Sequence, residues 1–160
     1  MTEKIILQDK EPEIGANAEQ IAECIIARIG LLPRKRGSTT SMHRTFIEFY
    51  ERSKKATATK DPKEAVMTVE EMAIYARISR QTMYEYLQRW LELGMIQKVT
   101  YLDSANKAII GYKLTGNSLE DSFLKARAQI TKNLDKTQKY IQDLQKALKN
   151  EKISAKMKQN

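Results

Sequence analysis

Five side chains that can donate hydrogen bonds lie within the first three turns of a predicted helix: Arg80, Gln81, Thr82, Tyr84 and Gln88. Arg and Gln can pair with guanine and adenine edges through two hydrogen bonds, and hydroxyl groups can bind phosphate. Ser79 would cap this helix, leaving the backbone amides of the first turn open to a phosphate. Glu85 either accepts from cytosine or pairs with Arg89 four residues later. The chemistry indicated is noncovalent recognition of DNA, with Ser79 included in the binding surface.

Two helix starts in quick succession would position these side chains. Thr68 is a good N-cap, Glu71 three residues later completes a capping box, and Ser79 caps the second helix after a short turn. A first helix of about eight residues, a tight turn and a longer helix suit the major groove. The side of the second helix that faces the core is expected to carry Met83, Leu87, Trp90 and Leu93.

A β-hairpin is predicted directly after this helix pair. Gly94 resembles a helix C-cap, residues 96–102 then alternate with period two, and a turn at 103–106 precedes a second strand at 108–114. Four side chains of the hairpin could bind backbone phosphate or simply face solvent, and both interpretations stay open: Lys98, Asn106, Lys107 and Lys113.

The segment 78–87, continued by Leu91-Glu92-Leu93-Gly94-Met95-Ile96, resembles the recognition helix of winged helix-turn-helix transcription regulators. Met95 departs mildly from the Leu of that pattern, and Tyr112-Lys113-Leu114-Thr115 resembles the closing strand of the wing. The similarity covers roughly a third of the chain, and its motifs are specific only as a set. It implies a regulatory role in addition to the duplex binding that the residues themselves indicate.

The N-terminal part is expected to contain an arm and two helices. Residues 1–12 are polar, and helical spacing of Ile21, Cys24, Ile25 and Ile29 predicts a helix over 16–32. Ser41 would cap an amphipathic helix over 43–55 with an aromatic face, and residues 56–64 are predicted to form a loop. A basic connector lies between the two helices and contains Arg34, Lys35 and Arg36. It is expected either to enter the minor groove of DNA or to be a solvated linker.

The last helix is predicted from Leu119 to about Lys152, with a frayed tail after it. Apolar residues recur in steps of three and four, with one stutter where the step from Ala126 to Ile130 is followed by another four. This narrow stripe predicts a homodimeric coiled coil, because about 50 Å of helix exceeds what a small domain can flank. Folding back on the N-terminal helix is the alternative. The expected dimer contacts are Phe123, Ile130, Leu134, Thr137, Ile141, Leu144 and Leu148.

Composition narrows the function classes. The single Cys24 and the lack of a signal peptide indicate a reducing cytoplasm, and no apolar run reaches the roughly 20 residues of a membrane span. Cys24 and His43 lack the companions that a metal site needs, so no metal or cofactor is expected, and no catalytic motif indicates an enzyme. The net charge of +8 is concentrated after residue 20, which suits a polyanionic partner.

The sequence therefore predicts a mainly α protein with a small β-hairpin wing: a winged helix-turn-helix domain plus a long C-terminal coiled-coil helix. The expected division is 1–37 arm and helix, 38–117 DNA-binding domain, 118–152 dimerisation helix and 153–160 tail. The expected function is a homodimeric, sequence-specific regulator of transcription that binds double-stranded DNA. The alternatives are an architectural or plasmid-partition DNA-binding protein and a winged-helix protein-interaction adaptor.

Overall fold

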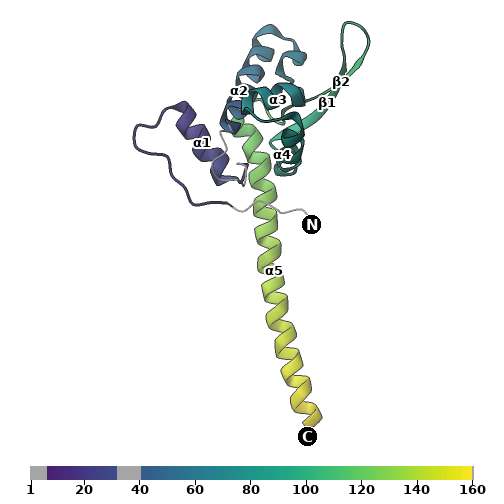
Figure 1. Ribbon diagram of the computed structural model, residues 1–160. Helices are drawn as coiled ribbons and strands as arrows, with labels where there is room; N and C mark the ends of the chain where they lie inside the picture. Colours follow the sequence, from purple (N-terminus) through teal and green to yellow (C-terminus); the bar gives the residue numbers. More distant parts are fainter. Residues whose placement is uncertain (1–6, 32–40, 160) are drawn as a thin grey trace. The chain divides into compact units, whose positions relative to one another are not determined.

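The computed structural model describes residues 7–31 and 41–159, which are mainly helical with one two-stranded antiparallel sheet and a long C-terminal helix (Figure 1). The predicted basic connector Arg34-Lys35-Arg36 lies outside the described residues. The chain divides into two compact units, one through Ala126 and one from Arg127 onward, and each is described by itself. The elements in order are α1 Ala18–Arg28, α2 Met42–Thr59, the 3-10 helix η1 Pro62–Ala65, α3 Val69–Ala76, α4 Arg80–Leu93, β1 Ile96–Leu102, β2 Ala108–Leu114 and α5 Leu119–Gln159.

The core of the first unit is centred on Trp90. Its ring lies 6.2 Å from that of Phe46 and 5.9 Å from that of Phe49, so the predicted aromatic face of α2 packs on the buried side of α4. The buried residues of α4 are the four predicted ones, Met83, Leu87, Trp90 and Leu93. Large apolar side chains taken out of water here supply the main driving force for docking the two helices.

Helix α1 packs on α2 and is shorter than predicted; of the four residues whose spacing predicted it, Cys24 and Ile29 are buried. Asn17 and Gln20 form a reciprocal capping box that starts it. Its buried residues are Ala22, Cys24, Ile26 and Ala27, whereas Ile21 is 41% exposed and Ile25 is half-buried. The prediction over 16–32 was wrong at its end because the helix stops at Ile29 and Gly30 follows with a φ of 74°, in the left-handed region that favours glycine.

Helix α2 continues four residues beyond its predicted end at Lys55, so the loop predicted over 56–64 is not present as such. The hydroxyls of Thr57 and Thr59 donate to the carbonyls of Ser53 and Lys55 at 3.1 and 2.9 Å, which lets both threonines sit inside the last turns. Lys60 ends the helix with a left-handed φ of 55°, and Pro62 then opens η1. The Thr and Asp-Pro signals therefore mark a helix end and a 3-10 turn.

Arg52 links α2 to α3 through a hydrogen bond and ion pairs. Its guanidinium donates to the Val66 carbonyl at 2.9 Å, pairs with Glu48 at 3.0 Å and also pairs with Glu71. Burial lowers the pKa of Arg52, but the bonds to Glu48, Glu71 and Tyr75 outweigh that effect and raise it above its ordinary value. The positive charge of Arg52 is thus a fixed part of the fold at any physiological pH.

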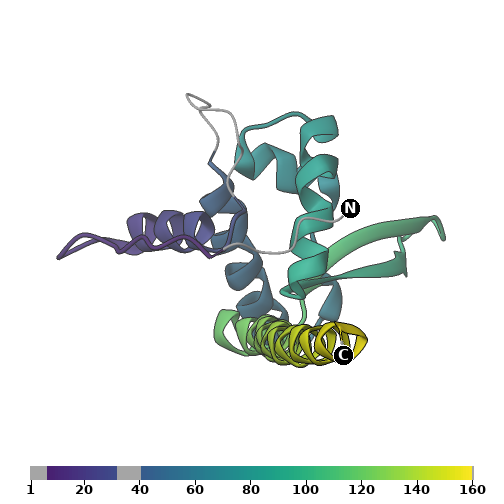
Figure 2. The same ribbon diagram turned by 90° about the horizontal axis from the view of Figure 1, so that it is seen from below.

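The hairpin has the two predicted strands, which pair Ile96 with Leu114 through Leu102 with Ala108. It projects from the domain on the side away from α1 (Figure 2). Its base is tied to the segment before α3, because Met67 and Tyr112 exchange two backbone hydrogen bonds of 2.8 and 2.7 Å. Gly111 permits this approach: a Cβ atom there would lie 2.2 Å from Cγ1 of Val66. The hairpin is therefore anchored to the segment that precedes α3.

Helix α5 begins inside the first unit and continues through the second. Ser118 caps it by accepting from the amide of Asp121 at 3.1 Å, and Ser122 and Ala126 are fully buried. The helix reaches Gln159, beyond the predicted end near Lys152. The boundary between the units falls directly after Ala126, where the stutter of the apolar pattern begins. Among the described residues, no helix combines the length and apolar character needed to cross a membrane.

Candidate nucleic-acid interface

A tight turn of three residues joins α3 to α4. Arg77 ends α3 in the left-handed region with a φ of 56°, and the amide of Ile78 donates to the Ala73 carbonyl at 3.1 Å. Ser79 then starts α4 by accepting from the amide of Thr82 at 3.1 Å. Thr68 likewise accepts from the amide of Glu71 at 3.3 Å, so both predicted N-caps are confirmed. A short helix, this turn and a 14-residue helix follow one another as expected.

One side of α4 is exposed, and we call its five residues the α4 face: Arg80, Gln81, Tyr84, Glu85 and Gln88. The opposite side carries the buried Met83, Leu87 and Trp90. Thr82 is half-buried, and its hydroxyl lies 2.8 Å from that of Ser79, so these two predicted contacts are occupied in holding the helix start. The α4 face contains one cation and one anion, so its recognition capacity lies in hydrogen-bond donors and acceptors more than in net charge.

Arg80 is held by two neighbours. Its Nε lies 2.9 Å from Oε1 of Glu70 on α3, and its Nη2 donates to the Tyr84 hydroxyl at 3.4 Å. The guanidinium carbon also lies 5.6 Å from the centre of the Tyr84 ring. The hydrogen bond to Tyr84 and the charge of Glu70 raise the pKa of Arg80 above its ordinary value. Arg80 nevertheless stays open to solvent, with 62% of its side chain exposed.

The end of the α4 face is also engaged within the chain. The side-chain amide Nε2 of Gln88 donates to the carboxylate of Glu92 at 3.1 Å, which orients the Gln88 side chain along the helix. Arg89 donates to the Gly30 carbonyl at 3.2 Å and so links α4 to the segment that follows α1. Arg80 and Gln81 lie at the start of the helix, and both are exposed.

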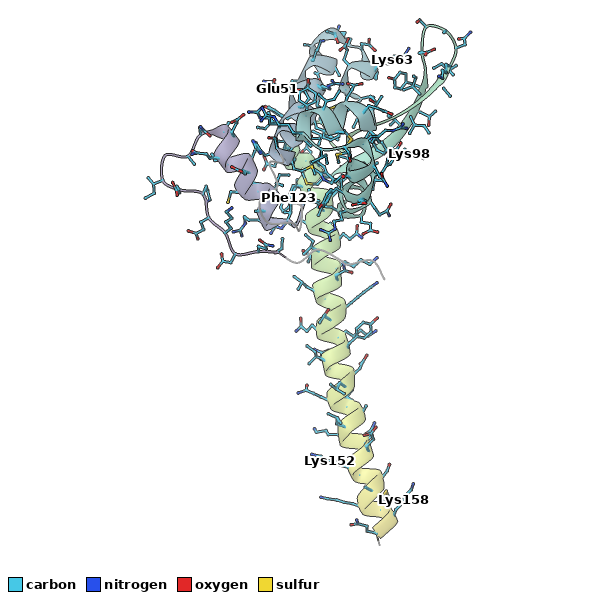
Figure 3. The ribbon with its side chains drawn as sticks, viewed as in Figure 1. Glu51, Lys63, Lys98, Phe123, Lys152 and Lys158 are labelled. Carbon is cyan, nitrogen blue, oxygen red and sulfur yellow. The ribbon has the colours of Figure 1, made fainter. Side chains whose placement is uncertain are left out.

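Lys98 of the hairpin lies on the same side as α4. It is exposed and directly opposite Tyr112 in the strand register, and opposed residues of an antiparallel pair project from one face. Tyr112 is buried, which raises its pKa, and the nearby Tyr84 of α4 raises it further. Figure 3 shows Lys98 on the hairpin. Lys98 therefore lies at the base of the hairpin, on the side of the hairpin that faces α4.

Two more of the four predicted hairpin contacts, Asn106 and Lys107, lie at the tip of the hairpin. Asp103 accepts from the amides of Ala105 and Lys107, each at 2.9 Å, and thereby shapes the turn. Asn106 has a left-handed φ of 59°, a conformation that Asn tolerates better than most residues. Asn106 and Lys107 are exposed but belong to the tip, apart from Lys98 at the base.

Lys113 projects from the face of the hairpin opposite to Lys98, since neighbouring residues alternate along a strand. It pairs with Gln97, and both line a pocket of about 320 Å³ between the end of α2, η1 and the base of the hairpin. Ser53, Thr57 and Lys60 also line this pocket. Lys113 is therefore not brought together with the α4 face.

Sequence reasoning missed two residues beside the interface. Arg77 is exposed in the turn before α4, and Glu70 contacts Arg80 directly. Glu70 could be interpreted only as a first-turn acid that favours the helix dipole, because the pairing depends on how α3 and α4 cross. Arg77 carried no signal beyond its place next to the expected cap.

No group of three or more His, Cys, Asp or Glu side chains that could hold a metal ion occurs in the part of the chain that the structure describes.

Comparison with protein-family models gives no match, and comparisons with curated proteins and with solved structures likewise give none.

Proposed function

We propose that residues 38–117 form a winged helix-turn-helix domain and that the protein is a homodimeric, sequence-specific regulator of transcription that binds double-stranded DNA. The observation that carries this proposal is the division of α4. Its buried side is held by Trp90 and its neighbours, while its exposed side presents Arg80, Gln81, Tyr84 and Gln88 beside the wing. A helix fixed in this way can enter a major groove without unfolding any part of the domain.

The two ends of the proposed surface have different tasks. Arg80 and Gln81 at the start of α4 would contact base edges, where bidentate pairing discriminates between base pairs. Lys98 at the base of the wing, and Asn106 and Lys107 at its tip, would contact backbone phosphates, which fix the position of the helix without distinguishing sequence. The exposed Arg77 adds a cation next to the same helix start.

The dimer part of the proposal rests on the second unit, where Leu134, Ile141, Leu144 and Leu148 are 65%, 56%, 57% and 47% exposed. From Ile130 to Leu148 the stripe follows steps of four and three, with Thr137 as its one polar member. The partner it fits is a second copy of the same helix, because this spacing places one continuous apolar seam on each helix.

The positions that would flank this seam favour self-association. On a heptad in which Leu134, Ile141 and Leu148 share one position, the flanking residues are Thr131, Asn133, Gln138, Tyr140, Gln145 and Ala147. None of them is charged, whereas Lys132, Asp135, Lys136, Lys139 and Asp143 all lie on the outer positions. Two identical helices can therefore meet along this side without placing like charges opposite each other.

The test is selection of duplexes from a random-sequence library by the full-length protein, followed by gel-shift titration at fixed salt. We expect an enriched and near-palindromic site. Arg80→Ala should weaken binding to it by about tenfold or more, because a base contact with two hydrogen bonds is lost. Lys152→Ala removes the same charge near the end of α5 and serves as the matched control (Figure 3).

Three other results would contradict parts of the proposal. A footprint that spreads with protein concentration would favour the architectural role, and binding that is weak and insensitive to salt would favour the adaptor. Equal binding by Arg80→Ala and Lys152→Ala variants would remove Arg80 from the base-reading surface.

A further inference from the structure

Glu70 places a negative charge next to the proposed DNA-binding surface, where a negative charge would not be expected. It is the second residue of α3, and its carboxylate reaches across the turn to Nε of Arg80 at 2.9 Å. Its neighbour Glu71 points elsewhere and pairs with Arg52, inside the contact between α2 and α3. A favourable helix dipole explains an acid at either position, but it does not explain why one acid is aimed at the first residue of α4.

The contact with Glu70 leaves Arg80 with free hydrogen-bond donors, but the pair of side chains together has almost no net charge. Of its five N–H groups, one faces Glu70 and one donates to Tyr84, and the other three have no partner among the described residues. Both side chains are largely exposed, at 62% for Arg80 and 54% for Glu70, so an incoming ligand meets the pair together. What approaches Arg80 therefore also approaches a carboxylate.

Phosphate and guanine respond differently to that carboxylate. A phosphate carries a full negative charge and is repelled by Glu70, which cancels most of its attraction to Arg80. A guanine edge has two acceptors and no net charge, so it can bind the free donors with little repulsion. The carboxylate of Glu70 thus weakens the contact of Arg80 with phosphate more than its contact with guanine. Specificity can be gained by repelling the competing ligand in this way.

We propose that Glu70 is a specificity-determining residue that directs Arg80 toward base edges by penalising its contact with backbone phosphate. This inference rests on the proposed DNA-binding function and concerns the same site. It assigns to α3 a part in sequence reading that does not require α3 to touch a base.

Glu70→Gln tests the proposal, because it keeps the size and removes the charge. In the full-length protein, affinity for a random-sequence duplex should rise by about two- to fivefold, the range that exposed ion pairs usually produce. Affinity for the selected duplex should rise less, so the ratio of the two affinities should fall. The salt dependence of random-duplex binding should steepen by up to about one unit, as expected if Arg80 gains a phosphate contact.

Two further variants isolate the effect. Glu51→Gln removes an exposed acid from α2, which Figure 3 places on the other side of the domain from Lys98, and it should leave the affinity ratio unchanged. In an Arg80→Ala background, Glu70→Gln should no longer alter the ratio, because the arginine through which it acts is gone.

The outcomes separate this inference from the function on which it rests. If the wild-type protein selects no duplex sequence, the proposed function fails and Glu70 has nothing to discriminate. If the wild type selects a sequence but Glu70→Gln keeps the same ratio as Glu51→Gln, the function stands and the inference is wrong. Weaker binding of the selected duplex by Glu70→Gln would also overturn it, because Glu70 would then only position Arg80.

Discussion

Tyr112 shows how one residue can report on the contact between the wing and α4. Burial first, and then the charge that Tyr84 would carry, raise the pKa of Tyr112 above its ordinary value of 10.0. A raised pKa in the folded state means that the folded chain holds the phenolic proton more tightly than the unfolded chain does. Any stabilisation from this residue is therefore complete below pH 10.0 and is lost as the pH rises through the folded value.

Alkaline titration followed by tyrosinate absorbance should consequently show a late step above pH 10.0 that Tyr112→Phe removes. In the same range the wild type should lose thermal stability faster than the variant does. Tyr140→Phe is a suitable control, because Tyr140 is 65% exposed on α5. If the Tyr112→Phe variant retained the late step, a different tyrosine would be the one shielded.

At the scale of elements, the anchoring of the wing depends on the missing side chain at Gly111. Gly111→Ala would place a methyl group 2.2 Å from Cγ1 of Val66 and 3.2 Å from the Met67 carbonyl, so the hairpin and the segment before α3 must move apart. We expect a loss of about 1–3 kcal/mol in the free energy of unfolding, as for other overpacked sites. Thermal or urea unfolding would measure it.

A second substitution checks the cause. Val66→Ala removes the atom that clashes, so the double variant should regain part of the stability that Gly111→Ala loses. Full additivity of the two losses would mean that the close approach at Gly111 does not limit the packing.

The helix pair, the hairpin and the buried face of α4 could be predicted because each is encoded locally. The caps at Thr68 and Ser79, and the turn residues 103–106 between two short strands, are signals within a few residues. The length of α1 was overestimated because apolar residues continue past Gly30, where the backbone leaves the helix, and which apolar residues of α1 are buried depends on its packing against α2. The end of α2 was missed because its threonines satisfy their hydroxyls within the helix.

The candidate site was predictable only in part, for a related reason. The types and positions of Arg80 and Gln81 can be read along one helix, and so can the exposure of Gln88 opposite a buried row. The pairing of Glu70 with Arg80 and the proximity of Tyr84 to Tyr112 depend on how separate elements cross. A single sequence contains no local pattern for such contacts.

Charged residues within the apolar stripe of α5 should disrupt the proposed dimer. Placing charges within it by Ile141→Asp with Leu148→Lys should abolish dimer formation, because both groups would have to be buried in an apolar seam. Sedimentation should then report a monomer, and affinity for a target with two half-sites should fall far more than affinity for one half-site. Thermal unfolding of the first unit should be unchanged, since both residues lie beyond Ala126.

A matched variant places the same charges on the outer side of the helix. Gln142→Asp with Asn150→Lys should leave the sedimentation behaviour of the wild type intact. If the seam variant also remained dimeric, the interface would lie elsewhere, and the exposed Ile21 of α1 would be the next residue to test.

For the whole molecule, the distribution of charge predicts a steep dependence of DNA binding on salt. The chain carries 28 Lys and Arg against 20 Asp and Glu: residues 1–20 hold five acids and two bases, whereas residues 21–160 hold 26 bases and 15 acids. Binding should release condensed counterions, so the logarithm of affinity should fall linearly with the logarithm of salt concentration. Lys98→Ala should reduce that slope by about 0.9, the value for one phosphate, without changing base preference.

Lys152→Ala serves again as the control of equal charge and should leave the slope unchanged. A flat salt dependence in the wild type would count against any duplex-binding role. A Lys98→Ala variant with the wild-type slope would instead show that the base of the wing does not contact phosphate.

If α5 forms the proposed dimer, the apolar stripe from Ile130 to Leu148 has a consequence for how the protein responds to its own abundance. From Ile130 to Leu148 it spans only about 27 Å, which is short for a helix pair. A pairing of this size is governed by mass action, so halving the number of chains more than halves the number of pairs. If only pairs occupy a target with two half-sites, occupancy at low abundance rises with the square of chain concentration. A small change in synthesis or degradation would then be amplified into a sharper change at the target.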